Sequence, residues 1–215
     1  MNALFQNREE AGHQLGQLLA EYRNSNAIVV GIPHGGVSVA SVVAAELISP
    51  LEVIPCRKIK HPADATKTIG SVSEDEVFIH DCSHTIPQDY VYHQILLLRN
   101  AMAAERKKYY GSIKPQSLRY RTVILVDDML STSDTILACL RDIKKQNPLK
   151  VVVAVPIVAA EAARVVSAEA DDLKFIKMES VLDPSHEYFA DYPRVDDKKV
   201  KQLLYSSRKN LKLYE

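Results

Sequence analysis

The sequence predicts an α/β domain, namely a mainly parallel, twisted sheet with helices on both faces and a small hood-like C-terminal appendage. Short apolar runs such as AIVVGIP and TVILV alternate with segments of helical periodicity along most of the chain. Runs that are apolar at nearly every position are typical of strands buried on both faces of a parallel sheet. We expect the 215 residues to form one domain, with the appendage at about residues 178–215.

The N-terminal half opens with an amphipathic helix at residues 8–23, whose leucines fall on one face. A strand at 27–33 breaks at PHGG and leads into a buried helix rich in small residues. LEVIPC at 51–56 is a second strand. Residues 57–68 are polar and have no convincing period, whereas 69–80 predict two short strands around an acidic turn.

The C-terminal half continues the alternation of strands and helices. A long helix at 90–111 has a basic last turn and a glycine as its stop signal. Residues 180–209 hold an aromatic-rich loop and a closing helix. Between them we expect strands at 122–126, 150–158 and 173–179, with helices at 135–146 and 159–170.

The composition of the chain limits the classes of function that we expect. Lys+Arg and Asp+Glu are both 27, so no broad positive field attracts nucleic acid. The three cysteines, Cys56, Cys82 and Cys139, lack metal-type spacing and are expected to be reduced thiols. The charged N-terminus does not look like a signal peptide, and the longest apolar run is too short to cross a bilayer. We therefore expect a soluble, cytoplasmic protein with no membrane partner.

Two adjacent carboxylates mark the candidate site. Asp127 and Asp128 follow the strand at 122–126, and ligands bind at the carboxyl ends of strands in parallel sheets. The loop from Met129 to Thr135 leads into a helix N-terminus, where backbone N–H groups and the helix dipole favour a phosphate. Carboxylates beside a phosphate site suit a sugar phosphate. The alternative is an ordinary turn with a Ser/Thr helix cap.

The PHGG turn is a second candidate anion site. Pro33, His34, Gly35 and Gly36 lie between a strand and a helix. The two glycines would let backbone N–H groups turn toward oxygens, with a strained or cis peptide as one way to do so. The alternative is a tight strand-to-helix turn without a ligand.

Basic residues follow the second strand at the same sheet edge. Arg57 and Lys58 open the polar segment KIKHPADATKT, which could be a mobile flap over the site. For Lys60 and Lys67, a solvated charged loop is an equally good interpretation.

Together these segments resemble the type I phosphoribosyltransferases. TVILVDDMLSTSDT resembles their ribose-phosphate motif, in which hydrophobic residues and two acids precede a hydroxyl-rich loop. GIPHGGVSVA, RKI, TIGSV, VVVAVPI and FADYPRVDDKKVKQLL resemble further blocks of an uncharacterised bacterial branch of predicted phosphoribosyltransferases. The resemblance extends over nearly the whole chain.

The resemblance implies the type I phosphoribosyltransferase fold and transfer of ribose 5-phosphate from phosphoribosyl pyrophosphate (PRPP) to a nitrogenous base or similar acceptor. Asp127 and Asp128 would bind the ribose hydroxyls as the catalytic pair. The 5-phosphate would lie on the loop Met129, Leu130, Ser131, Thr132, Ser133, Asp134 and Thr135. Pyrophosphate would contact Pro33, His34, Gly35, Gly36, Arg57 and Lys58. Mg²⁺ would be held mainly through PRPP and water rather than by a protein metal site.

Three residues depart from the family pattern. Family loops usually have glycine at the positions of Met129 and Ser133, and a small residue at that of Asp134. Glycine allows close backbone approach to a phosphate, whereas a carboxylate there repels it unless it points outward. His34 stands where the family usually has Arg, and it is only partly charged near neutral pH.

Two further expectations concern binding partners. Tyr188 and Phe189 could stack on a flat acceptor, with Asp183 or Asp191 bonding to its edge, although aromatic residues capping a core are equally common. The partners expected are PRPP and an acceptor, with a homodimer left open. The alternative function is a non-catalytic regulatory protein that binds PRPP or a nucleotide on the same fold.

Overall fold

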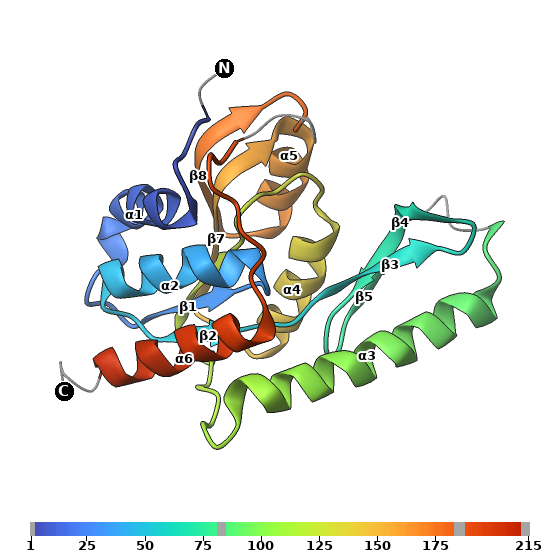
Figure 1. Cartoon of the computed structure of the whole chain (residues 1–215), viewed down its shortest axis with the longest axis horizontal. Helices are drawn as coiled ribbons and strands as arrows, with labels where there is room; N and C mark the ends of the chain where they lie inside the picture. Colours follow the sequence, from blue (N-terminus) through green and yellow to red (C-terminus); the bar gives the residue numbers. More distant parts are fainter. Residues whose placement is uncertain (1–2, 81–84, 183–187, 212–215) are drawn as a thin grey trace.

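The computed structural model describes residues 3–80, 85–182 and 188–211. Its centre is a five-stranded parallel sheet in the order β2-β1-β6-β7-β8 (Figure 1). The predicted mainly parallel α/β fold is therefore confirmed. The strands are β1 (Ala27–Gly31), β2 (Leu51–Val53), β6 (Thr122–Val126), β7 (Lys150–Ala159) and β8 (Asp172–Glu179).

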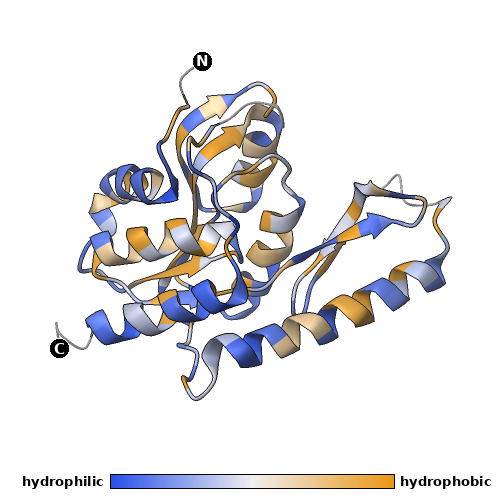
Figure 2. Cartoon of the chain, in the orientation of Figure 1, coloured by the Kyte–Doolittle hydropathy of each residue, from blue (hydrophilic) through white to orange (hydrophobic). Residues whose placement is uncertain are grey.

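Helices cover both faces of this sheet. On one face α4 (Asp134–Lys145) and α5 (Ala160–Glu169) pack on side chains such as Val30 and Leu125. The other face carries α1 (Arg8–Leu18), α2 (Gly35–Leu47) and α6 (Asp197–Leu211). The central strands are buried on both sides, which explains why they are apolar at nearly every position (Figure 2).

A second sheet forms an arm beside the main body (Figure 1). It consists of the antiparallel strands β3 (Arg57–His61), β4 (Asp64–Val72) and β5 (Val77–Ile79). The long helix α3 (Gln88–Tyr110) packs along it, and Ile59, Ile69 and Met102 form their shared core. The polar residues 57–68, which show no period in the sequence, thus form β3 and the start of β4. The second predicted strand, 51–56, ends early at Val53.

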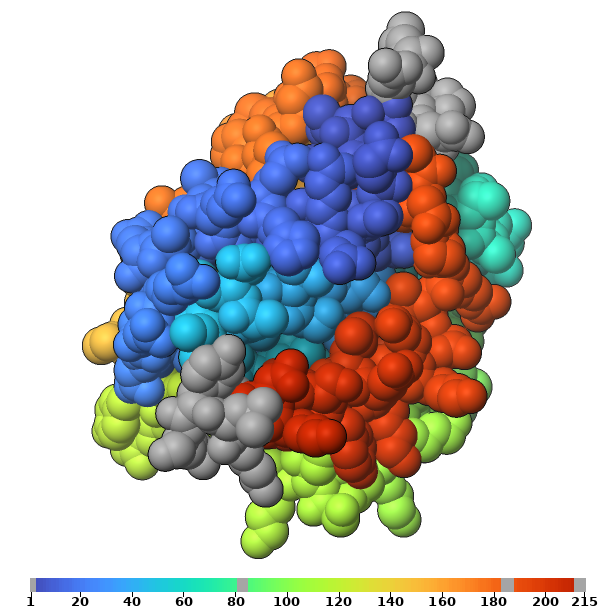
Figure 3. All heavy atoms as spheres, turned by 60° about the vertical axis from the view of Figure 1, so that its left-hand side comes forward, coloured from blue at the N-terminus to red at the C-terminus, as the bar shows by residue number. Residues whose placement is uncertain are grey.

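The N-terminal segment lies against the segment that leads into α6. Phe5 and Phe189 form a parallel bridge, and their rings are 5.4 Å apart. Figure 3 shows the C-terminal segment running beside the N-terminal segment and α2. Helix α6 buries Val200 and Leu204 in the same core as α2. The segment predicted to be an appendage therefore shares the core of the main body.

Candidate functional site

The acid pair lies at the carboxyl end of β6, beside the start of α2. The backbone N–H of Asp128 donates to the Asp127 carboxylate over 2.9 Å. Burial, and secondly the negative charge of Asp128, raise the pKa of Asp127 well above its ordinary value. The nearby charge of Lys58 acts in the opposite direction. The pair is therefore a site that favours a proton, a cation or hydrogen-bond donors.

The double glycine makes room for these carboxylates. Helix α2 begins at Gly35, directly after a cis peptide bond between Pro33 and His34. A Cβ atom on Gly36 would lie 2.7 Å from Asp127 Oδ1, and one on Gly35 would overlap the Asp128 carboxylate. Side chains at these positions would push the acids away from the helix start, whose free N–H groups and dipole favour negative charge.

Two residues that the sequence analysis missed hold Asp128. The Arg8 guanidinium donates to Asp128 Oδ2 over 2.8 Å, and the Tyr192 hydroxyl donates to the same oxygen over 2.8 Å. Arg8 also lies over the Tyr192 ring, 3.6 Å from its centroid. Burial, and secondly the charge of Asp128, raise the pKa of Tyr192, so its hydroxyl remains a donor. No local pattern marks either residue, because they contact Asp128 across 120 and 64 positions of the chain.

One cleft brings most of the predicted residues together. It has a volume of about 330 Å³, and Arg8 and Tyr192 lie in its wall. An adjoining hollow shares His34 and Arg57 with it. The predicted residues that line the cleft are Pro33, His34, Gly35, Arg57, Lys58, Asp127, Asp128 and Thr135.

Two basic side chains of the cleft, those of Arg57 and His34, are paired with acids of α3 and α6. Arg57 forms an ion pair with Glu105 of α3. The imidazole of His34 lies 3.0 Å from Asp197 at the start of α6, and the Tyr109 hydroxyl donates to the same carboxylate oxygen over 2.8 Å. These hydrogen bonds, led by that of Tyr109, lower the pKa of Asp197. Glu105, Tyr109 and Asp197 were also missed, since they come from helices that look like ordinary solvated surfaces.

The hydroxyl-rich loop is anchored near its start and exposed beyond that point. Leu130 is buried, and its backbone bonds to Ile157 and Ala159 in β7, each over 2.9 Å. Ser131 and Thr132 are exposed. Among the described residues of this loop, only Thr135 lines the cleft.

Asp134 is turned away from the cleft. It is buried at the first position of α4, and its carboxylate lies 2.9 Å from the imidazole of His80. The Ser71 hydroxyl donates to its backbone carbonyl over 2.7 Å. The negative charge of Asp134 therefore faces the second sheet rather than the predicted phosphate position.

The predicted acceptor residues are buried. Tyr188 and Phe189 are 7% and 5% exposed, and Phe189 packs between Phe5 and Tyr192. Tyr192, three residues later, is the aromatic residue that lines the cleft. Asp191 is exposed, and Asp183 lies outside the described residues.

Two kinds of feature are absent from the described residues. Across residues 3–80, 85–182 and 188–211 there is no group of three His, Cys, Asp or Glu side chains that could hold a metal ion. Within the same ranges, no helix combines the length and the apolar character needed to span a bilayer.

Comparisons of the chain with a family model and with curated proteins agree on one family. A family model described as "Phosphoribosyl transferase domain" matches residues 2–197. Two Mycobacterium tuberculosis proteins, "Putative phosphoribosyl transferase MT0597" and "Putative phosphoribosyl transferase Rv0571c", are each 32% identical over 165 residues. The match covers 72% of this chain but only 36% of either relative, so the chain spans about a third of their length.

Solved structures extend the likeness to the fold. The protein TT1426 from Thermus thermophilus superposes with a TM-score of 0.78 at 28% identity, covering 94% of this chain and 98% of that one. AQ2163 from Aquifex aeolicus gives a TM-score of 0.51 at 15% identity, over 93% of this chain and 85% of that one. At that identity the second likeness concerns the fold alone.

Proposed function

Because this chain belongs to the phosphoribosyl transferase domain family, we propose that it transfers ribose 5-phosphate from PRPP to a nitrogen-containing acceptor and releases pyrophosphate. The observation that carries this proposal is the acid pair packed against the Gly35–Gly36 helix start. Carboxylates held at the floor of a cleft with basic walls suit a sugar whose hydroxyls donate and whose phosphates need cations.

Asp127 and Asp128 would position the ribose. Arg8 and Tyr192 both bond to Asp128 Oδ2, and no described residue donates a hydrogen bond to Oδ1. That oxygen can accept from a ribose hydroxyl while the other keeps the carboxylate in place. In a reaction that breaks the bond between the anomeric carbon and pyrophosphate, such fixed orientation supplies much of the rate enhancement.

The phosphate groups would lie on either side of the acid pair. The N-terminus of α4, with the hydroxyls of Ser131, Thr132 and Thr135, would hold the 5-phosphate. Lys58 and Arg57, with the N–H groups at the start of α2, would stabilise the charge that develops on leaving pyrophosphate. Asp134 would not oppose phosphate binding, since its carboxylate faces His80.

Mg²⁺ would reach this site with PRPP. The carboxylates of Asp127 and Asp128 are hard oxygen donors of the type that Mg²⁺ prefers. The ion would be held mainly by PRPP oxygens and water, and would partly neutralise the pyrophosphate. The acid pair, for its part, would orient the ribose and its surrounding water.

A second candidate is a non-catalytic protein that binds PRPP or a nucleotide and regulates a partner. Two observations favour it. The Arg8–Asp128 ion pair satisfies one predicted ribose ligand without substrate, and His34 is tied to Asp197 rather than free to face an anion. The enzyme remains the better supported proposal, because Lys58, Asp127 and Thr135 all line the same cleft.

Pyrophosphate release separates these candidates. The full chain would be incubated with PRPP, Mg²⁺ and a panel of nucleobases, and released pyrophosphate would be measured. The enzyme predicts release that needs both Mg²⁺ and one acceptor, and that falls by about 100-fold in Asp128→Asn. Saturable PRPP binding without release across the panel would instead support the regulatory protein, and no PRPP binding at millimolar concentration would contradict both.

A further inference from the structure

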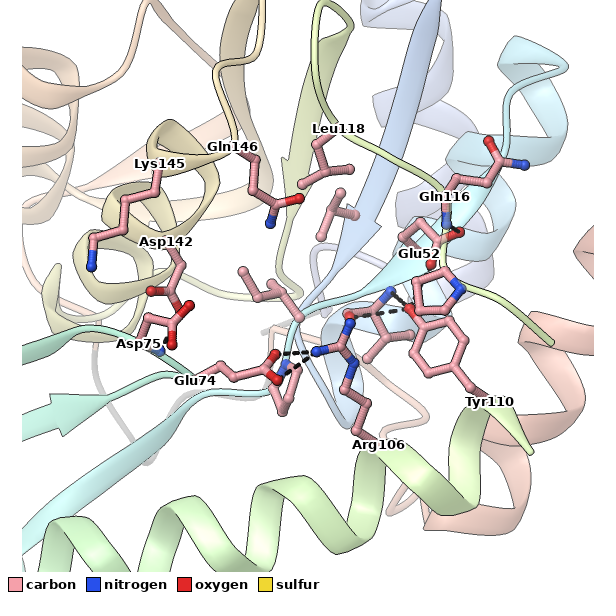
Figure 4. Close-up of a pocket in the computed structure, with 15 residues that line it drawn as sticks. Glu52, Glu74, Asp75, Arg106, Tyr110, Gln116, Leu118, Asp142, Lys145 and Gln146 are labelled. Atoms are coloured by element: carbon pink, nitrogen blue, oxygen red, sulfur yellow. Dashed lines mark hydrogen bonds and ion pairs between the residues drawn. The ribbon is translucent and has the colours of Figure 1, made fainter. Parts of the chain in front are cut away.

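A second cavity lies beside strand β2, between helices α3 and α4 (Figure 4). Its volume is about 410 Å³, which falls within the range of roughly 300–1,000 Å³ common for small-molecule sites. None of its lining residues lines the cleft described above or the adjoining hollow. It is therefore a separate candidate site.

The wall that faces the core is apolar. Val30, Ile54 and Leu118 belong to the core beneath α4 and also line the cavity. Pro55 and Pro115 extend this surface. A ligand would therefore bury part of a compact apolar body here.

Several charged groups around the cavity are already partnered. The Glu52 carboxylate accepts hydrogen bonds from the Tyr110 hydroxyl over 2.5 Å and from the Gln116 backbone N–H over 3.0 Å, and it forms an ion pair with Arg208. Glu74 is paired with Arg106. Because these groups are already engaged in hydrogen bonds and ion pairs, they are poorly suited to bind a ligand.

Asp142 is different. It is 6% exposed, and its Oδ2 accepts a long hydrogen bond of 3.4 Å from the Asp75 backbone N–H. Its Oδ1 is buried and has no hydrogen-bond partner among the described residues. Lys145, which lies on the same helix and lines the same cavity, forms an ion pair of 2.5 Å with Glu76. A buried carboxylate oxygen without a partner is costly, and it indicates a missing donor.

A second acid, Asp75, adds to this need for a hydrogen-bond donor. The exposed side chain of Asp75 lies at the same end of the cavity as Asp142, opposite the Glu52–Tyr110 pair (Figure 4). No hydrogen bond or ion pair engages the Asp75 carboxylate within the part of the chain that the structure describes. Burial raises the pKa of Asp142, and the charges of Asp75 and Glu76 add to the effect, whereas hydrogen bonds from the Ser73 hydroxyl and the Asp75 backbone N–H act in the opposite direction. The charge that has no partner at this end of the cavity is therefore negative.

We propose that this cavity binds a small organic cation, with a primary ammonium between Asp142 and Asp75 and a compact apolar body against Val30, Ile54 and Leu118. A primary ammonium carries three donors, enough for Asp142 Oδ1 and the Asp75 carboxylate together. A bare metal ion fits less well, because the described residues offer no group of three metal ligands. This proposal is independent of the phosphoribosyl transfer proposed for the other cleft.

Calorimetric titration of the full chain with cyclohexylamine tests this proposal, with cyclohexanol as a neutral probe of the same shape. The ammonium should bind at least about tenfold more tightly than the alcohol, because only the cation gains charge-assisted hydrogen bonds. Equal affinity for the two probes, or no heat from either at roughly tenfold excess over about 1 mM protein, would overturn the proposal.

Two variants locate the binding. Asp142→Asn and Asp75→Asn should each weaken cyclohexylamine binding by about tenfold, since each keeps the shape of the side chain and removes its charge. The control is Glu161→Gln, which removes an exposed charge on α5, where Glu161 pairs with Arg164. Asp75 is exposed, so its variant tests the site even if Asp142→Asn proves unstable. Affinity that is unchanged in Asp75→Asn would show that the ammonium does not lie at this end.

Discussion

Arg8 and Asp128 form an ion pair of 2.8 Å in the lining of the cleft, although 120 positions separate them in the chain. Both side chains are only 11% exposed. Arg8 also donates to the backbone carbonyl of Pro193 over 2.7 Å and lies over Tyr192. One guanidinium thus joins the N-terminal helix, the acid pair and the C-terminal segment.

Arg8→Gln should therefore destabilise the protein by about 3 kcal/mol, because it leaves the Asp128 carboxylate buried without its cation. Urea unfolding measures this change. The matched control is Arg164→Gln, which breaks a surface ion pair whose partners are both more than 70% exposed. That change should cost less than about 0.5 kcal/mol. Equal effects of the two substitutions would mean that the Arg8 pair contributes no more than a surface contact.

The two adjacent acids should respond oppositely to neutralisation. The raised pKa of Asp127 means that the folded state holds its proton more tightly than the unfolded chain does. Its contribution to stability is then complete below the ordinary pKa of 3.8 and is lost as the pH rises through the raised value. Asp127→Asn should accordingly unfold at a higher temperature than the parent protein at pH 7.

Thermal unfolding between pH 4 and pH 7 checks this prediction. The advantage of Asp127→Asn should shrink toward the acid end of the range, where the parent carboxyl is itself protonated. Asp128→Asn should lower the unfolding temperature at pH 7, because Arg8 then loses its partner. Destabilisation by both substitutions at pH 7 would contradict the difference between the two carboxylates.

Gly36→Ala should disturb the acid pair directly. The new Cβ atom would lie 2.7 Å from Asp127 Oδ1 and 3.0 Å from the backbone carbonyl oxygen of Val126, and the latter cannot move without disturbing β6. We expect a loss of about 1–3 kcal/mol in unfolding free energy, although alanine favours helices. Ser38→Ala, two residues further along α2 and partly exposed, is the control and should change stability by less than about 0.5 kcal/mol. A neutral Gly36→Ala would mean that the helix start can shift away from Asp127.

The sequence predicted the sheet and the place of the acid pair because buried parallel strands leave a local signal. TVILV is apolar at every position after its threonine, and the carboxylates must follow at the functional edge. The second sheet left no such signal, since β3 is RKIKH and only Ile59 among its side chains is fully buried. Its pairing depends on α3, which follows more than twenty residues later in the chain.

The sequence did not predict the partners of the acid pair for a similar reason. Arg8 stands at the start of an amphipathic helix, where a charged residue normally faces solvent, and Tyr192 follows an aromatic pair that looked better suited to ligand contact. Tyr192 stacks on Phe189 and lies under Arg8, and its hydroxyl donates to Asp128 from that position. Such contacts arise from the assembled fold and not from any single segment.

His34→Arg should strengthen PRPP binding. His34 lies 3.0 Å from Asp197 and lines both the cleft and the adjoining hollow. An arginine there could keep Asp197 with one N–H group and direct others into the cleft, adding a permanent positive charge. One charge-assisted hydrogen bond to pyrophosphate corresponds to about tenfold in affinity. Calorimetric titration of PRPP with Mg²⁺ measures the gain.

His34→Gln is the matched control, since it retains a hydrogen-bonding group without the charge. Ser133→Gly can be added to test backbone access at the start of α4. Asp134 should be left in place, because it is buried and lies 2.9 Å from the imidazole of His80, which would lose its partner. If His34→Arg binds PRPP no more tightly than His34→Gln, the pyrophosphate does not approach this residue. If affinity rises while pyrophosphate release stays undetectable with every acceptor, the cleft binds PRPP without turning it over, and the regulatory protein becomes the better proposal.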